Sequence, residues 1–326
     1  MRFIDRLSVA VALTITLLFS AAAAEASAPQ QKTQAPGYYR MMLGDFELTT
    51  LCDGTFPMDA SKLLTGITPK QLDAALSGSF LKDPFELSVD AFLVNTGSKL
   101  VMIDTGAGVL FGPTLGKLLA NLKAAGYRPE QVDEIYITHM HGDHIGGLVT
   151  DGKITFPNAI VRAAQQEADF WLSKPHMDAA PKERKDAYES AMNMLNPYVS
   201  AGKFKPFNGD TELVPGVRAV ASPGHTAGHT LYVVESKGQK LALWGDLMHV
   251  AAAQFPNPAV TILFDTDSAM AAEQRKKAFA EAAAQGNWVA AAHLPFPGIG
   301  HLRAAGSGRA AGLGYIFVPV NYSALN

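Results

Sequence analysis

The chain has 326 residues, of which 48% are hydrophobic and 17% charged, and its formal net charge is −3. This length and apolar content allow a sizeable buried core and exclude a disordered protein. The slightly acidic balance argues against nucleic-acid binding and against a polybasic membrane-binding face, and it favours a small neutral partner.

The first residues are typical of an export signal. Arg2 and Arg6 precede the apolar run LSVAVALTITLLFS, and the small residues AAAAEASA follow it. The run is shorter than the roughly 20 residues that span a bilayer, which favours cleavage after Ala24 or Ala26 over a retained anchor. We therefore predict a signal peptide over residues 1–26, a periplasmic or secreted location, and no membrane span in the mature chain. Cys52 is the only cysteine, so no internal disulfide can form.

A polar stretch and then a series of strand and helix signals follow. Residues 27–45 are expected to form a polar leader or extended N-terminal arm, and residues 46–326 a single domain. FELTTLCDG, starting at Phe46, predicts a strand that ends in a turn. Residues 91–108 predict two apolar strands joined at Thr96–Ser98, with Asp104 where the second strand ends.

The next elements bring a histidine-rich stretch to a sheet edge. Residues 112–126 have the apolar spacing of an amphipathic helix that stops at a glycine, and Glu134–Thr138 predict a short buried strand. THMHGDHIGG begins at the end of that strand. Strand, helix and strand in this order place those side chains at the carboxyl edge of a sheet, where open α/β folds bind ligands.

The second half repeats part of this plan. Leu231–Asp246 again predict two apolar strands around a glycine turn, with an aspartate at the end. Helices are expected at Lys182–Asn196 and Ser268–Gln285, the latter followed by Gly286. Two related halves, each with a sheet and outer helices, predict an α/β fold of four layers, αββα, with two mixed sheets.

The histidine-rich stretch has the spacing of a metal site. His139 and His141 alternate around one residue, so on an extended segment both imidazoles face the same side. Gly142 permits a sharp turn, after which Asp143 and His144 face a neighbouring point. The pattern predicts two adjacent cations.

Further ligands are expected at three other strand ends. His225 follows VRAVAS in a turn made by Pro223 and Gly224, Asp246 ends LALWGD, and His293 follows NWVAAA. Asp246 could bridge both ions. These nitrogen and oxygen donors suit zinc best and tolerate cobalt, manganese or iron.

The motifs THMHGDH, PGHTAGH, GD and AAH, in this order, resemble those of the metallo-β-lactamase superfamily from about Phe46 to the end of the chain. The resemblance implies that residues 46–326 form a hydrolase domain of that fold, with Asp104 as a supporting aspartate. It also implies two ligand sets that share one carboxylate: His139, His141, His225 and Asp246 in one, and Asp143, His144, His293 and Asp246 in the other.

A longer likeness runs through GYYRMMLGDFELT, FGPTLGKLLANLKAAGY, QVDEIYITHMH, NPYVSAGKFKPF and HLPFPGIGHLRA. These stretches look like the methyl parathion hydrolase group and the related dihydrocoumarin lactonases. This likeness implies an exported, homodimeric, dizinc enzyme with an aromatic-lined pocket. The pocket positions are Phe111, Trp171, His249, Ile262 and Phe264, and of these His249, Ile262 and Phe264 depart from the residues of the organophosphate hydrolase.

The predicted chemistry is hydrolysis by a hydroxide held between two cations, with Asp143 and Asp246 as the catalytic carboxylates. A neutral aromatic wall favours an uncharged hydrophobic substrate, because burying an unpaired charge is costly. His249 favours a lactone or aryl ester as the main substrate, with phosphotriesters as a side activity; the alternative is that His249 only supports the site by hydrogen bonding and has no role in selectivity. Three alternatives stay open: methyl parathion hydrolysis as the main activity, a mononuclear iron sulfur dioxygenase, and an exported metal-binding protein without turnover. His229 is expected to hold its loop by hydrogen bonding, and His301 to lie either near the site mouth or in a structural position.

Overall fold

The computed structural model describes residues 28–306 and 314–325, so the predicted signal peptide lies outside the described residues. By its internal contacts the chain divides after Ala35, and the body that carries the fold begins at Pro36. Among the helices of the described part, none has both the length and the apolar character needed to cross a bilayer.

One half of the body is built on a mixed sheet of six strands. Its strands, in spatial order, are β1 (Tyr38–Leu43), β2 (Phe46–Met58), β4 (Phe85–Asn95), β5 (Leu100–Ile103), β6 (Glu134–Tyr136) and β9 (Ile160–Arg162). The pairs from β1 to β5 are antiparallel, whereas β5, β6 and β9 run parallel. The carboxyl ends of β5 and β6 therefore meet at one edge.

The other half is built on a sheet of seven strands. In spatial order these are β10 (Thr211–Val214), β11 (Val217–Ala221), β12 (Thr230–Ser236), β13 (Gln239–Leu243), β15 (Trp288–Ala290), β16 (Ile299–Ala304) and β17 (Tyr315–Pro319). Only β13 and β15 pair in parallel; the other neighbours are antiparallel. Two short ribbons, β3 (Leu64–Thr65) with β14 (Thr261–Ile262) and β7 (Val149–Thr150) with β8 (Lys153–Ile154), lie outside the two sheets.

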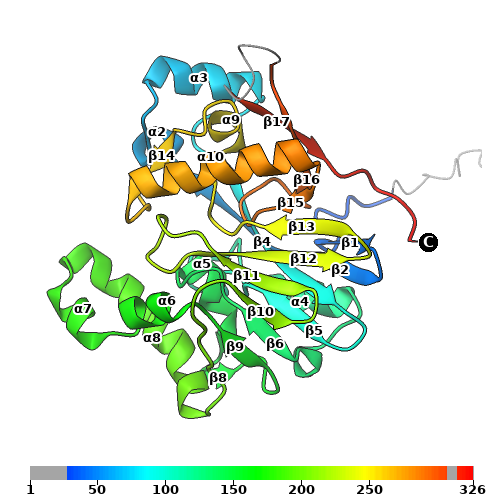
Figure 1. Ribbon diagram of the computed structural model, residues 1–326, viewed down its shortest axis with the longest axis vertical. Coiled ribbons are helices and arrows are strands. Elements are labelled where there is room, and N and C mark those ends of the chain that lie inside the picture. The colour runs from blue at the N-terminus through cyan, green and yellow to red at the C-terminus, as the bar shows by residue number, and fades with distance from the viewer. Residues whose placement is uncertain (1–27, 307–313, 326) are drawn as a thin grey trace, which may run out of the picture. The chain divides into compact units, whose positions relative to one another are not determined.

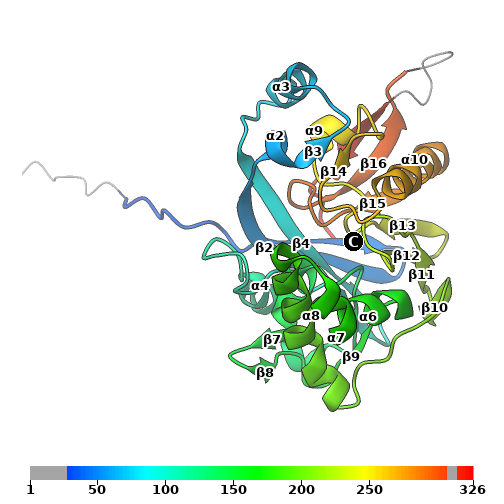
Figure 2. The ribbon, with the colours of Figure 1, turned by 90° about the vertical axis from the view of Figure 1, so that its left-hand side faces the viewer.

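Helices cover the outer face of each sheet, as Figures 1 and 2 show. The first half carries α4 (Leu118–Ala124), α5 (Gly142–Ile145), α6 (Gln165–Trp171), α7 (Lys174–Ala179) and α8 (Lys182–Ser200), with 3-10 turns η1 (Pro129–Gln131) and η2 (Gly146–Leu148). The second half carries α9 (Ala251–Gln254) and α10 (Ser268–Gln285). The helices α2 (Ala60–Leu63) and α3 (Pro69–Gly78) lie beside α9 and the β3–β14 ribbon.

Three buried apolar clusters separate the layers. Val101 and Tyr136 of the first sheet meet Tyr232 and Leu243 of the second in the central cluster. A second cluster packs α4 and α8 on the first sheet, and a third packs α10 on the second sheet through Phe279. The expected four-layer αββα sandwich is confirmed.

Two local expectations differ from the structure. The helix expected over residues 112–126 begins only at Leu118, because the Asp53 carboxylate accepts hydrogen bonds from the backbone of Gly116 and Leu118 and holds the preceding residues in a turn. Residues 38–43, expected in an extended arm, form β1, and every residue of β1 pairs with one of β2. The sheet therefore begins before residue 46.

Candidate metal centre

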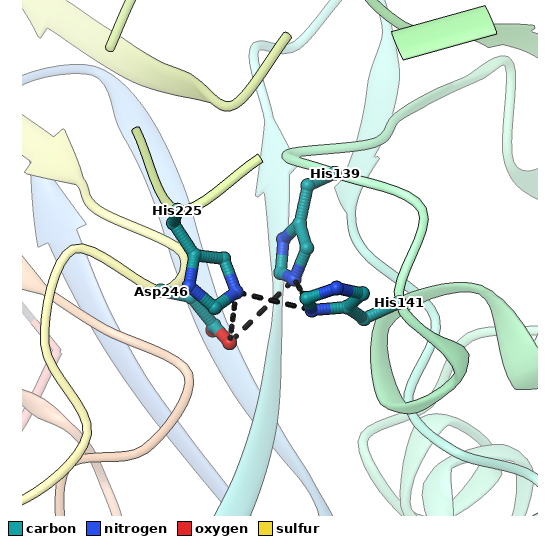
Figure 3. A group of neighbouring side chains, drawn as sticks. All are labelled: His139, His141, His225 and Asp246. Atoms are coloured by element: carbon teal, nitrogen blue, oxygen red, sulfur yellow. Dashed lines mark hydrogen bonds and ion pairs between the residues drawn. The ribbon is translucent and has the colours of Figure 1, made fainter. Parts of the chain in front are cut away.

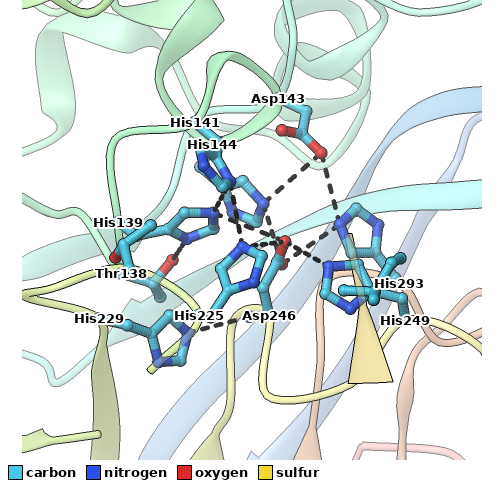
Figure 4. Close-up of polar contacts among 12 residues, drawn as sticks. Thr138, His139, His141, Asp143, His144, His225, His229, Asp246, His249 and His293 are labelled. Carbon is cyan, nitrogen blue, oxygen red and sulfur yellow. Dashed lines mark hydrogen bonds and ion pairs between the residues drawn. The ribbon is translucent and has the colours of Figure 1, made fainter. Parts of the chain in front are cut away.

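Four strand ends deliver seven histidine and aspartate side chains to one place (Figure 4). The segment after β6 carries His139, His141, Asp143 and His144. His225 follows β11, Asp246 follows β13, and His293 follows β15, so the second sheet supplies the rest. The structure thus brings together all the residues that the sequence predicts as metal ligands.

Two histidines, His139 and His225, face one oxygen of Asp246, and His141 lies against both of them (Figure 3). Nδ1 of His141 lies 3.0 Å from Nε2 of His139 and 3.0 Å from Nε2 of His225. Oδ2 of Asp246 lies 3.5 Å from His139 Nε2 and 3.3 Å from His225 Nε2. These four donor atoms lie within 4.8 Å of one another, which is the spacing of ligands around one cation.

The other oxygen of Asp246 faces a second group. Oδ1 lies 3.0 Å from Nε2 of His144 and 3.2 Å from Nε2 of His293. Oδ2 of Asp143 lies 3.6 Å from His144 Nε2 and 3.4 Å from His293 Nε2. Asp246 therefore lies between the two groups with one oxygen toward each.

Two buried polar atoms of the cluster test whether it fits a metal ion. His144 Nε2 and Asp246 Oδ1 are buried and, within the described structure, have no hydrogen-bond partner, although they lie 3.0 Å apart. Buried polar atoms without a partner are rare in native proteins, and a cation between such donors supplies the missing contact. The donor set fits two divalent metal ions, and nitrogen and carboxylate ligands of this kind suit zinc.

The opposite ring nitrogens of the histidines are held by hydrogen-bonding partners. Nδ1 of His144 lies 2.8 Å from Asp104, Nδ1 of His225 lies 2.9 Å from Asp265, and Nδ1 of His293 donates to a backbone carbonyl, that of Ser88. Such partners fix the orientation of a metal-binding imidazole.

Asp104 is also tied to the loop that carries the first ligands. Its two oxygens accept hydrogen bonds from the backbone N–H and the hydroxyl of Thr138, at 2.8 and 2.7 Å. The Asp104 backbone has a φ of 58°, which lies in the left-handed region. The carboxylate at the end of β5 contacts His144, in agreement with the supporting role that the family resemblance implies.

Burial and charge set the protonation of the cluster. Burial lowers the pKa of His141 to about 3 and that of His139 well below its usual value, so both are neutral. Burial also disfavours charge on His225 and His293, but contacts with Asp246 and with a second carboxylate, Asp265 and Asp143 respectively, outweigh it and raise their pKa values to about 9 and about 10. The carboxylates thus favour positive charge in the cluster. Bound metal ions would supply that charge and displace the protons from the histidines.

Two further histidines lie beside the ligands. His229 accepts a hydrogen bond from the backbone N–H of Asp246 through Nε2, and its Nδ1 lies 3.1 Å from the Ser222 carbonyl, so it holds the loop as expected. His249 points Nε2 at Asp246 Oδ2, at 3.0 Å. The other ring nitrogen of His249 is buried and has no partner in the described structure.

A cavity of about 550 Å³ opens onto the cluster. Of the predicted pocket residues, Phe111, Trp171, His249 and Phe264 line it. Ile262 does not, because pairing of β14 with β3 turns its side chain into the core packed around α2, α3 and α9. The neighbouring Leu263 lines the cavity in its place.

Other lining residues were not predicted from the sequence. Five of them are apolar or aromatic and come from segments far apart in the chain: Phe56, Leu87, Leu110, Phe170 and Tyr188. No local pattern distinguishes them from core residues. His301, left open between the site mouth and a structural position, lies on β16 against Trp288, with ring centroids 3.8 Å apart, and is not among the lining residues.

This fold and this pair of donor sets define a metal-dependent hydrolase. The family model described as "Metallo-beta-lactamase superfamily" matches residues 84–293, and the chain belongs to that superfamily. An N-acyl homoserine lactonase of a Bacillus species is 27% identical over 69% of this chain and 84% of its own length. The Bacillus cereus N-acyl homoserine lactonase is 25% identical over the same shares.

Two solved structures resemble the chain over nearly its whole described length. The hydrolase AbOPH of the beta lactamase superfamily is 37% identical, with a TM-score of 0.84, and the match covers 90% of this chain and all of that one. The dizinc quorum-quenching lactonase AidC, in complex with a product, is 28% identical with a TM-score of 0.80, covering 88% and 99%. The dizinc neighbour agrees with the two donor sets found here.

Proposed function

We propose that this metal-dependent hydrolase opens neutral hydrophobic lactones and cleaves aryl esters, with phosphotriester cleavage as a side activity. The observation that carries the proposal is the cavity beside the metal cluster, whose walls near the cluster are largely apolar and aromatic. The N-acyl homoserine lactonases among the relatives, and the product-bound lactonase among the similar structures, support the lactone class.

The cavity has aromatic walls near the metal cluster and a charged rim. Phe111 stacks on Phe56 on one side, with ring centroids 6.4 Å apart, and Trp171 packs against His141 on another, at 5.4 Å. Outside the metal cluster, the charged residues of the lining are Glu183, Arg184 and Asp186, and they lie in the exposed first turns of α8. An apolar substrate is therefore buried near the cluster, whereas a charged group would be accommodated at the rim.

The residues around the cluster supply binding, orientation and proton handling. Two divalent ions bound by the two donor sets would supply Lewis acidity and a nucleophilic water near neutral pH. Asp143 is the more exposed of the two carboxylates and faces the cavity, so it can orient that water and accept its proton. His249 also lines the cavity, and its Nε2 faces Oδ2 of Asp246. With that oxygen engaged by a bound ion, the Nε2–H would be free to donate a hydrogen bond to the departing oxygen, and the aromatic walls exclude bulk water.

We further propose that the protein is exported and acts as a homodimer. Residues 1–26 have the charge, the apolar run and the small residues of a cleaved signal, and these support export to the periplasm or beyond. The resemblance to an exported hydrolase group supports the dimer. Cell fractionation and light scattering of the mature protein test the two statements separately.

The test of the activity uses one purified sample and several substrates. Metal per chain is counted by elemental analysis, and kcat/KM is compared for dihydrocoumarin, an N-acyl homoserine lactone, an aryl ester and methyl parathion. Two metals with the lactones ahead support the proposal, whereas methyl parathion ahead would replace it by phosphotriester hydrolysis. One iron per chain with oxygen consumption on a persulfide would mean a sulfur dioxygenase instead.

A further inference from the structure

Glu167 is a buried carboxylate that lies outside both donor sets. It belongs to α6, and its relative exposure is 0%. Burying a carboxylate is costly unless several donors contact it, so its partners indicate what it stabilises.

The partners of Glu167 lie on two loops, one from each half of the fold. Oε1 accepts a hydrogen bond from the backbone N–H of Met140, at 2.9 Å. Oε2 accepts from the hydroxyl of Thr226, at 2.8 Å, and from the backbone N–H of Gly228, at 2.9 Å. One side chain thus joins the segment after β6 to the segment after β11.

Both loops carry ligands of the same donor set. Met140 lies between His139 and His141, and Thr226 directly follows His225. The close approach is built into the backbone as well, because a Cβ added at Gly228 would lie 2.5 Å from the backbone nitrogen of Glu167. None of the three hydrogen bonds involves Asp143, His144 or His293, the ligands that belong only to the other donor set.

We propose that Glu167 is a positioning residue for one of the two metal ions. By fixing the two loops against α6, it holds His139, His141 and His225 at the spacing that this ion requires. Loss of Glu167 should therefore weaken one ion selectively and leave the other in place. The inference concerns metal affinity and holds for any substrate of the enzyme, so its failure is distinct from failure of the proposed function.

Glu167→Gln is the informative substitution. Glutamine has one acceptor oxygen where glutamate has two, and all three partners are donors, so one loop loses its contact and faces an NH₂ group. The matched control is Asp53→Asn. Asp53 is also fully buried and accepts three backbone N–H groups, from Ala107, Gly116 and Leu118, but these lie on a different loop.

The measurement is the release of Co²⁺ from the loaded protein as the activity of a chelator is raised in steps. Visible absorption reports how much Co²⁺ stays bound at each step. We expect E167Q to release one ion per chain at a chelator activity about tenfold lower than the wild type, with the second ion unchanged. The variants His293→Ala and His225→Ala identify the ions: E167Q should weaken Co²⁺ binding in the first background and leave it unchanged in the second. D53N should lower the stability to urea while its two release steps match the wild type.

Two results would overturn the inference. They are release of both ions from E167Q as in the wild type, and earlier release of both ions together, which would indicate a general loss of structure. If E167Q does not fold, the release experiment is repeated with Thr226→Val, which removes a single hydrogen bond to Glu167 at nearly constant volume. The same two results would then overturn the inference.

Discussion

Nε2 of His249 lies 3.0 Å from Oδ2 of Asp246, and this contact places an imidazole between the metal cluster and the apolar wall of the cavity. The ring stacks on that of His293, with centroids 5.2 Å apart and planes 19° from parallel. The backbone N–H of His249 donates to the side chain of Gln254, which fixes the segment. A polar group thus faces any substrate bound in this part of the cavity.

Replacing His249 by leucine should change the substrate preference. We expect kcat/KM for dihydrocoumarin to fall about tenfold, the equivalent of one hydrogen bond in the transition state, and methyl parathion to be affected less. The ratio of the two kcat/KM values is measured on samples with equal metal content. Leu263→Ala is the control, because it alters the wall without removing a donor. An unchanged ratio in H249L would mean that His249 has no part in selectivity.

Removal of Asp246 should affect both donor sets, because each of its oxygens faces a different set. We expect Asp246→Ala to bind fewer than two metals per chain and to lose roughly 10²–10³-fold or more in kcat. Elemental analysis and kinetics on the same sample provide the two values. If D246A retained two metals per chain, Asp246 could not hold the shared position.

Arg275 stabilises the segment that carries Asp246 and His249. Its fully buried guanidinium donates to the carbonyls of Leu247, Pro258 and Val260, at 2.6, 3.0 and 2.6 Å. Arg275→Met removes all of these hydrogen bonds, and of the three carbonyls Val260 keeps a second donor, the Gln254 side chain. We expect the free energy of unfolding to fall by about 3–5 kcal/mol. Urea unfolding measures the loss. Lys276→Ala, at an exposed position of the same helix, should change stability little, and an equal loss in both variants would contradict the prediction.

The Cys52 thiol should make stability depend on pH in the alkaline range. Burial, with a contribution from Asp90, raises the pKa of Cys52 from 9.0 to about 12. A raised folded-state pKa gives stability that is present below the unfolded-state pKa and is lost as pH rises toward 12. Between about pH 8 and pH 10.5 we therefore expect the wild type to lose about 1–2 kcal/mol more than Cys52→Ser does. Parallel losses in the two proteins would show that the thiol ionises equally in both states.

The sequence predicts best the features that short local patterns determine. Helix α10 has the expected bounds, since Asp267 caps its first turn and Gly286 ends it with a φ of 66°. The metal cluster was predictable because most of its ligands directly follow strands in compact motifs. Helix boundaries set by distant residues were not, as the late start of α4 under the influence of Asp53 shows.

Residues that support the ligands were missed for a related reason. Glu167 contacts the histidine-bearing loops from 27 to 61 positions away, and Asp265 contacts His225 from 40 positions away. Neither residue belongs to a sequence motif that marks it. Ile262 shows the converse error, because an apolar residue beside the predicted wall can face either side, and strand pairing decides which. Only the three-dimensional contacts separate these cases.

Each donor set takes two side chains from the segment after β6 and two from the loops of the second sheet. A bound ion therefore joins the two halves of the sandwich as a covalent cross-link would, in a chain whose single cysteine cannot form an internal disulfide. Unlike a disulfide, this cross-link is reversible, and its contribution to stability follows the free metal concentration. The resistance of the enzyme to unfolding thus depends on the metal supply around it as well as on its own sequence.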